Sequence, residues 1–284
     1  MLTALLALAG LLPAAPAPLP DPLALVVAAT SQEDEGPSEE LVETTVTALE
    51  AALKEKDPAR LVTACNEAAE VPHEDVAKVL AKTLKVRLKG EPRETVLQAA
   101  LAALGAQGNE VALKALHRTY AKDKDLRKHE ELGTALLRAI GSHAHESSIE
   151  VLTDDVTSTP SNDALRARAL GLARIRTDES LAAVIELMNR MTRGKRVRQM
   201  EDFRLALCVL TGVDKGKEPT AWMQWWNDVK KSFEVQPKLP TLPKQLDRRW
   251  RQYWGIQSGE GRGSKREDRG GDGRELLAPP PTTR

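Results

Sequence analysis

The feature that most constrains this chain is a repeat of about 36 residues. Leucines occupy one position of the repeat at spacings of 36, 35 and 35 residues, at Leu101, Leu137, Leu172 and Leu207. A second position recurs every 36 residues, at Leu80, Leu116, Leu152 and Met188. Two positions that agree on one period indicate a repeated structural unit.

Each unit has the apolar spacing of helices. Leu97, Leu101 and Leu104 stand at i, i+4 and i+7, which places them on one helix face. A turn follows the first helix, with glycine expected just past its last apolar residue, at Gly105, Gly141 and Gly212. Caps for the second helices are expected at Asn109, Thr177 and Thr220, and Asp57 before Pro58 is a further cap. The unit is therefore predicted to be a two-helix hairpin.

One such hairpin cannot bury its apolar face, so neighbouring hairpins must stack. The composition agrees, because aromatic residues make up only 3% of the chain and alanine and leucine favour helices. We predict an all-α fold, a right-handed α-solenoid of about five two-helix repeats, over residues 38–256. The predicted units are Asp57–Pro92, Arg93–Leu126, Arg127–Pro160, Ser161–Gly194 and Lys195–Phe233, preceded by a capping helix at Ser38–Glu55.

This pattern resembles the HEAT-repeat family, in the broad sense that includes HEAT-like and armadillo-like repeats. The resemblance covers Asp57 to Phe233 and depends on the period, the capped second helix and a first helix that ends in Leu-Gly or Ile-Gly. The closing stretch, Leu210-Thr211-Gly212 followed by Trp222, Trp225 and Trp226, looks like the last repeat of some exported bacterial members. The resemblance implies a curved scaffold that binds macromolecules, with no shared catalytic residues and no cofactor.

The two ends of the chain differ from the repeats. Residues 1–29 contain no lysine or arginine and carry an apolar run followed by small residues and prolines, which is typical of a secretory signal that lacks a basic start. Cleavage is possible after Ala17 or Ala29, and we favour Ala29 because Pro18 would follow the first site. A disordered leader and a misassigned start codon are the alternatives. Residues 30–37 form an acidic linker, and glycine-rich residues 257–284 are predicted to be disordered.

A basic cluster lies between two predicted units, at Arg190, Arg193, Lys195, Arg196 and Arg198. Several positive charges on one loop edge could meet a phosphate or an acidic partner. A solvated loop is the simpler interpretation, which we favour. Lysine and arginine total 41 and so do aspartate and glutamate, so a wholly basic nucleic-acid surface is excluded and we do not expect nucleic acid as the partner.

The segment 237–256 changes character again. Prolines recur every third residue, as in polyproline II, and a basic amphipathic helix follows. Its candidate binding residues are Arg248, Arg249, Trp250 and Trp254. This helix could present tryptophan and arginine to a partner or an anionic surface, or it could fold back and seal the last repeat, which we favour.

Other candidate sites are weak. His143 and His145 have a spacing found in metal sites, but a third ligand is lacking, so we expect no metal. Cys65 and Cys208 fall in different units and are expected to be buried and unbridged. The cluster of Trp222, Trp225 and Trp226 is expected to form an aromatic cap at the end of the stack.

The sequence thus predicts a non-catalytic scaffold or adaptor that binds an unknown protein partner and has no transmembrane span. The alternatives are binding to an anionic surface or nucleic acid through the basic clusters, and a HEAT-like lyase or glycosylase. The enzyme alternative would need a pocket that joins an exposed Trp222 or Trp226 to Asp214 or Asp228.

Export has a direct test. When the chain is expressed from its own start codon, we expect a mature protein that begins at Thr30 in the exported fraction, because Val27-Ala28-Ala29 has the small residues that signal peptidase requires. N-terminal sequencing of each cell fraction measures this. An intact chain that begins at Met1 in the cytosol would contradict it.

Overall fold

The computed structural model describes residues 36–88, 91–156, 161–193 and 200–256. These residues form helices and connecting turns, with no strand among them. None of the helices in these ranges combines the length and the apolar character that crossing a bilayer requires. The predicted signal segment and the C-terminal tail lie outside the described residues, so both remain predictions.

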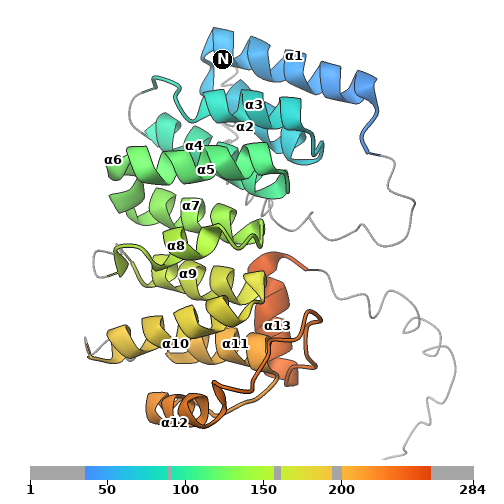
Figure 1. The fold of residues 1–284 in the computed structure, drawn as a ribbon. Helices are drawn as coiled ribbons and strands as arrows, with labels where there is room; N and C mark the ends of the chain where they lie inside the picture. The colour runs from blue at the N-terminus through green and yellow to red at the C-terminus, as the bar shows by residue number, and fades with distance from the viewer. Residues whose placement is uncertain (1–35, 89–90, 157–160, 194–199, 257–284) are drawn as a thin grey trace, which may run out of the picture.

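The first helices of the units pack on one another in sequence order and form an inner layer (Figure 1). They are α2 (Pro58–Ala69), α4 (Glu91–Ala106), α7 (Glu130–Ser142), α9 (Asn162–Ile175) and α11 (Met200–Thr211). Each contacts the next member of the layer. Leu101, Leu137, Leu172 and Leu207 are all buried, so the leucine that defines the repeat is a core residue at each level of the stack.

The second helices of the units form an outer layer that covers the first. They are α3 (Glu74–Thr83), α5 (Glu110–Lys122), α8 (Ser148–Thr153), α10 (Asp178–Arg193) and α12 (Pro219–Val229). The remaining helices are α1 (Glu39–Glu55), which covers the start of the stack, the short α6 (Lys124–Lys128) and α13 (Lys244–Trp254). Figure 1 shows α13 running along the stack, across the direction of the other helices.

Most of the predicted caps are confirmed, but the helices do not follow every predicted unit boundary. α4 begins at Glu91, before the expected start at Arg93, and α6 crosses the expected boundary after Leu126. Ser38 precedes α1, and the Asp57 side chain accepts a hydrogen bond from the Arg60 amide at 3.0 Å. Asn109 caps α5. Thr177 accepts a hydrogen bond from the Ser180 amide at 3.1 Å. These caps satisfy amides that have no partner inside the helix.

Two local predictions were wrong. Thr220 is not a cap, because α12 begins at Pro219 and Glu218 precedes it without a side-chain cap. Proline is favoured at this first position because it has no amide to satisfy. Gly105 and Gly141 do not end their helices but lie inside α4 and α7. Gly212, with a φ of +71°, does follow α11 in the left-handed conformation.

Glycine inside the inner helices permits close packing. A β-carbon built on Gly141 would lie 2.7 Å from the Gly171 α-carbon of the next helix and 3.4 Å from the Trp254 ring. Any side chain at this point would therefore force α7 and α9 apart. The backbone contact between these two glycines sets the spacing at the middle of the inner layer.

Buried polar side chains tie successive hairpins together. The Gln107 amide donates to the Ala68 carbonyl at 2.8 Å, and its oxygen accepts from the His73 amide at 3.0 Å. Arg168 is only 2% exposed and donates to the Leu152 carbonyl and the Tyr120 hydroxyl. Buried polar groups with such partners fix the relative position of the hairpins, since their loss would leave unsatisfied groups in the core.

The two cysteines are free and buried, as predicted. Burial raises the pKa of each thiol, Cys65 and Cys208, to about 12. Both therefore remain protonated and behave as small apolar residues.

An extended linker returns the chain from α12 to α13, and Arg176 holds it in place. The Arg176 guanidinium donates to the carbonyls of Gln236, Pro237 and Lys238. Arg176 itself follows α9 in the left-handed conformation, with a φ of +59°. The proline-rich segment is thereby anchored to the end of the fourth hairpin.

The glycine contact gives a prediction for stability. Gly141→Ala is expected to lower the free energy of unfolding by about 1–3 kcal/mol, the usual cost of overpacking a core. Denaturant unfolding followed by circular dichroism measures this. Gly36→Ala is the control, because a β-carbon there meets nothing within 4 Å. Equal stability of the two variants would show that the α7 and α9 backbones are not in contact.

Candidate functional site

Two adjoining cavities form one groove along the inner layer. A cavity of about 600 Å³ lies against α4, α7 and α9, and a cavity of about 540 Å³ lies between α7, α9, α11 and α13. Thr134, Arg138 and Asp163 line both. We call the two cavities together the inner groove.

The first cavity, which we call the acidic half, has an alanine floor. Three alanines line it, one from α4 and two from α7, at Ala102, Ala135 and Ala139. Glu130 and Glu131 stand in the first turn of α7, and Asp163 stands in the first turn of α9. Carboxylates are favoured at these positions by the helix dipole. Because the inner helices stack in the same direction, their acidic first turns gather at one edge of the groove.

The second cavity, which we call the arginine half, is lined by Arg138, Arg166 and Arg249. Arg166 contacts two carboxylates, Asp163 at 2.9 Å and Asp202 at 3.1 Å. Arg249 of α13 donates to the same Asp202 at 3.0 Å. Asp202 is only 6% exposed, so its charge is buried and needs both partners. This carboxylate joins α9, α11 and α13.

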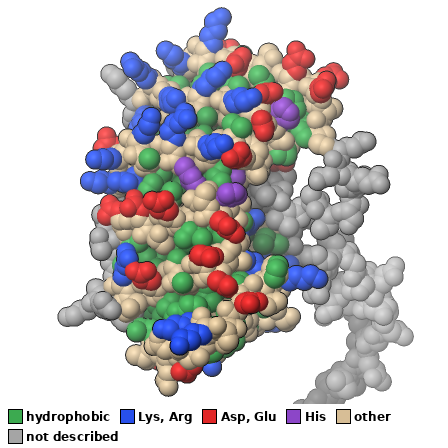
Figure 2. All heavy atoms as spheres, in the orientation of Figure 1, with side chains coloured by type: hydrophobic (Ala, Val, Ile, Leu, Met, Phe, Trp, Pro, Cys, Tyr) green, Lys and Arg blue, Asp and Glu red, His purple; other side chains and the backbone are tan. Residues whose placement is uncertain are grey.

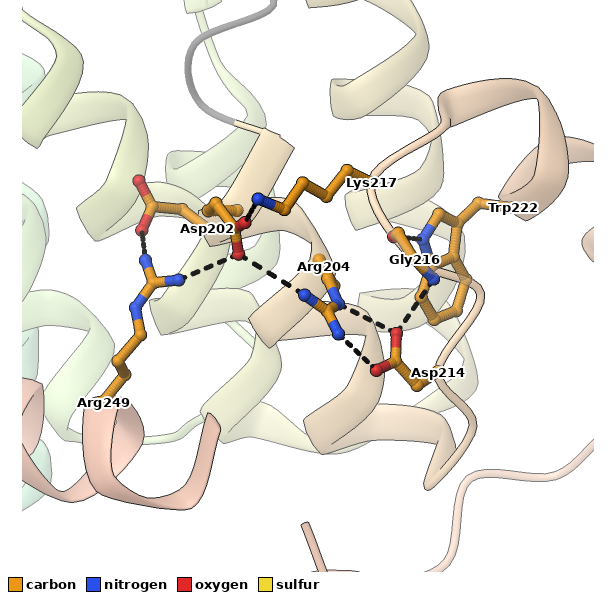
Figure 3. Close-up of polar contacts among 8 residues, drawn as sticks. Asp202, Arg204, Asp214, Gly216, Lys217, Trp222 and Arg249 are labelled. Carbon is orange, nitrogen blue, oxygen red and sulfur yellow. Dashed lines mark hydrogen bonds and ion pairs between the residues drawn. The ribbon is translucent and has the colours of Figure 1, made fainter. Parts of the chain in front are cut away.

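The ion-pair network continues past the groove to the last hairpin (Figure 3). Glu201 accepts from Arg249 at 3.1 Å and also pairs with Lys217 and Arg204. The hydrogen bond from Lys217 is the largest cause that lowers the pKa of Glu201. Arg204 in turn holds Asp214 with two hydrogen bonds, of 2.9 and 2.6 Å.

Asp214 organises the turn before α12. The Arg204 hydrogen bonds lower the pKa of this carboxyl from 3.8 to about 2. Asp214 also accepts from the Gly216 amide, and the Gly216 carbonyl accepts from Trp222 Nε1 at 2.8 Å (Figure 3). Trp222 is fully buried. Asp214 and Trp222 therefore stabilise the end of the stack, and they do not form the pocket that the enzyme alternative requires.

The other aromatic residues of α12 complete this cap. The Trp225 ring lies 5.9 Å from that of Trp222, 6.3 Å from that of Trp226 and 5.3 Å from that of Phe233. Trp225 and Trp226 are half-buried. The predicted aromatic cap is thus present, with Trp222 as its buried centre.

α13 packs its apolar stripe onto the inner layer. Leu246, Trp250 and Trp254, at i, i+4 and i+8, are all buried. Arg174 lies 4.7 Å above the Trp254 ring and Arg138 lies 4.9 Å above the Tyr253 ring, distances at which a cation is attracted to an aromatic face. The helix therefore folds back onto the stack.

The candidate binding residues of α13 thus divide into two groups. Trp250 and Trp254 are each 4% exposed and do not form a surface patch in this structure, because they pack onto the inner layer. Arg249 forms ion pairs with Glu201 and Asp202. Of these four residues, Arg248 is the exposed one. The packing of α13 agrees with the favoured prediction that this helix folds back, although it lies against α7, α9 and α11 and not only against the last repeat. A binding role for the four residues remains a prediction.

The structure describes only part of the basic cluster that is predicted between two units. Arg190 is exposed and pairs with Glu186 on its own helix. The other four side chains, Arg193, Lys195, Arg196 and Arg198, lie outside the described residues. The cluster therefore remains a prediction.

No metal site is found among the described residues. The His143 ring contacts the Leu104 carbonyl at 3.0 Å, and the His145 ring contacts the Ser147 hydroxyl at 2.9 Å. Burial lowers the pKa of His143, so this ring is held in its neutral form. Each histidine thus has a local structural contact.

The outer layer carries charges of both signs (Figure 2). Many of them are paired locally, as in Lys78 with Asp75 at 2.7 Å and Lys114 with Glu110 at 2.7 Å. Exposed pairs of this kind contribute at most about 1 kcal/mol each. This face is a solvated surface of mixed charge, without the concave shape of the inner groove.

Apart from Arg249, sequence reasoning missed the residues of the inner groove, although the repeat carried a signal. Groove residues recur every 36 residues, at Glu130, Arg166 and Asp202 and again at Gln98, Thr134 and Leu170. A third series contains Ala102, Arg138 and Arg174. Within each helix, the members of the three series are four residues apart, so they lie on the same helix face. A search for polar residues that recur every 36 residues would have found this face.

Comparison with known proteins identified no relative. No family model, curated protein or solved structure matches this chain.

The Asp214 carboxyl gives a prediction for pH dependence. Its pKa is lower in the folded state, so its contribution to stability is full above pH 3.8 and is lost as the pH falls toward 2. The pKa shift and partial solvent screening together suggest a contribution of about 1–2 kcal/mol at neutral pH. Asp214→Asn should lose this amount at pH 7, and the difference from the unchanged chain should shrink below pH 4.

Urea unfolding at pH 7 and pH 3 measures both values. Glu186→Gln is the matched control, because it removes one carboxylate of an exposed pair and should change stability by less than about 0.5 kcal/mol. A loss in Asp214→Asn that is the same at both pH values would contradict the assignment.

Proposed function

We propose that this chain is a HEAT-like helical-repeat scaffold, a right-handed α-solenoid of about five repeats, that binds a basic segment of a partner protein in the inner groove. The all-helical fold and the two layers of stacked hairpins support the repeat assignment. The proposed function is non-catalytic, since the groove offers a shape and a charge that suit recognition of a partner segment.

The observation that carries this proposal is the arrangement of the acidic half. Its carboxylates, Glu130, Glu131 and Asp163, are exposed at the rim, whereas the floor consists of small alanine side chains. A floor of alanine lets a main chain approach closely, and the carboxylates attract lysine or arginine side chains. Complementary charge of this kind gives both fast association and specificity.

Gln98 and Ser161 add polar groups to the same rim. The Gln98 amide donates to Glu131 at 3.0 Å, which orients that carboxylate toward the groove. The Ser161 hydroxyl caps α9 and contacts Thr134. The rim is thus preorganised, which lowers the entropic cost of binding.

A protein segment fits this groove because α13, a segment of the chain itself, already packs beside the acidic half. α13 lies in line with the acidic half, and its Tyr253 carbonyl accepts from Arg138, the residue shared by both cavities. The inner layer therefore accommodates a helix at one end, and the acidic half continues the same surface toward α4.

The alternatives receive less support. Binding to an anionic surface through α13 would need exposed aromatic and basic side chains, but Trp250 and Trp254 are buried and Arg249 is paired. A lyase or glycosylase would need a pocket that joins an exposed Trp222 or Trp226 to Asp214 or Asp228. Trp222 is buried and Asp214 is held by Arg204, while Trp226 is half-buried beside Trp225.

A labelled synthetic peptide tests this function. A short fluorescein-labelled peptide in which lysine alternates with serine should bind the full chain at low salt. Glu130→Gln combined with Glu131→Gln should weaken binding by about tenfold or more, because each removed charge contact contributes on the order of 1 kcal/mol. Fluorescence anisotropy measures the affinity.

Glu110→Gln combined with Glu186→Gln on the outer layer is the control for net charge, because it also removes two exposed carboxylates, and it should leave binding unchanged. A peptide in which glutamate replaces lysine should not bind. Equal binding to the groove variant and the control variant would overturn the proposal, since the attraction would then reflect overall charge.

A further inference from the structure

We infer that α13 is an internal ligand of the arginine half of the inner groove, and that an amphipathic helix of a partner protein replaces it. The partner helix would carry large apolar or aromatic residues at i, i+4 and i+8, in the pattern of Leu246, Trp250 and Trp254. It would also carry an arginine at the place of Arg249. This inference rests on the proposed function, because it assigns a partner to the same groove.

The groove recognises α13 through side chains that suit any helix of this type. Glu201 and Asp202 bind the Arg249 guanidinium, at 3.1 and 3.0 Å. Arg174 faces the Trp254 ring. Arg138 donates to the Tyr253 carbonyl in the last turn of α13, where a cation also interacts favourably with the helix dipole. The site therefore recognises three features of a helix: one arginine, an aromatic stripe and the C-terminus.

The contact is incompletely satisfied at the C-terminal end of α13. Tyr253 Oη and Trp254 Nε1 are buried without a hydrogen-bond partner, and so is Nε of the facing Arg138. Buried polar atoms without partners weaken a contact, because each has lost its bonds to water. These three unsatisfied atoms therefore partly offset the contacts that Arg138 and Arg174 make with the C-terminal end of α13.

α13 is also weak as a helix and separable from the stack. It has 11 residues, fewer than an isolated helix needs to be stable, and it starts at Pro243 without a side-chain cap. Its linker is anchored by Arg176 before α13 begins. Release of α13 therefore leaves the linker and the stacked hairpins in place.

The site remains formed when Arg249 leaves it. Asp202 keeps its contact with Arg166, and Glu201 keeps its contacts with Lys217 and Arg204. Release of α13 also opens Asp202 to water, which replaces Arg249 as its second partner. The two carboxylates therefore remain satisfied in the empty site, which can accept another arginine without rearrangement. A preorganised site binds a replacement with little entropic cost.

The experiment uses the full chain and a fluorescein-labelled peptide of residues 244–256. The resident helix competes with this probe, so the apparent affinity scales with the fraction of chains in which α13 is released. Arg249→Ala in the chain weakens only the resident helix, because the probe keeps its own arginine. Trp254→Ala also weakens the docking of the resident helix, through loss of the contact between the Trp254 ring and Arg174. Arg248→Ala, at an exposed position on α13, is the matched control.

Arg249→Ala and Trp254→Ala should each bind the probe about tenfold more tightly than the unchanged chain and Arg248→Ala, the factor expected from about 1.4 kcal/mol of lost docking. A probe that carries Arg249→Glu should lose this binding, which separates recognition by Glu201 and Asp202 from apolar adhesion. If Trp254→Ala does not fold, Arg249→Ala decides the result.

Two results would overturn the inference. In one, folded Arg249→Ala binds the probe no better than Arg248→Ala. In the other, the chain forms a dimer as its concentration rises and the probe does not bind, which would assign the site to α13 of a second copy. If the lysine peptide still binds through Glu130 and Glu131, then only this inference fails and the proposed function stands.

Discussion

The structure depends on the register in which the inner helices stack. A two-helix hairpin cannot cover its own apolar face, so each one must pack on the next. Gly141 and Gly171 meet in the middle of the inner layer, and their lack of side chains allows α7 and α9 to lie directly against each other. Because the helices are in register, side chains 36 residues apart fall at the same level of neighbouring helices. The buried leucines then form the core, and the polar series forms the groove.

The charged network follows from the same register. Asp202 lies on α11 at the position that Arg166 occupies on α9, so the two side chains meet across adjacent helices at 3.1 Å. A buried carboxylate is costly unless it is fully paired, and Arg249 of α13 supplies the second partner. The final helix is therefore directed to the groove by one buried charge and by its aromatic stripe.

Much of the fold could be predicted from the sequence, because helix periodicity and capping are local. The all-helical class, the helix at Glu39–Glu55 and the caps at Asp57 and Asn109 were predicted correctly. Gly105 and Gly141 were misplaced because a glycine needed for close packing looks the same as one that ends a helix. The groove was missed because it depends on which polar residues face one another across helices. The residues of α13 could not decide whether this helix packs on the stack or faces a partner, since Trp250 and Trp254 suit a buried contact and an exposed one equally.

Native-state hydrogen exchange of the full chain tests the central claim most directly, which is that α13 is a separable occupant of a groove built by the stack. Exchange of this kind reports the free energy of local opening for each segment. The account predicts that the amides of α13 exchange through an opening that costs much less free energy than that of α7, α9 and α11. Identical opening free energies for α13 and these inner helices would contradict it, because α13 would then be part of the same cooperative unit.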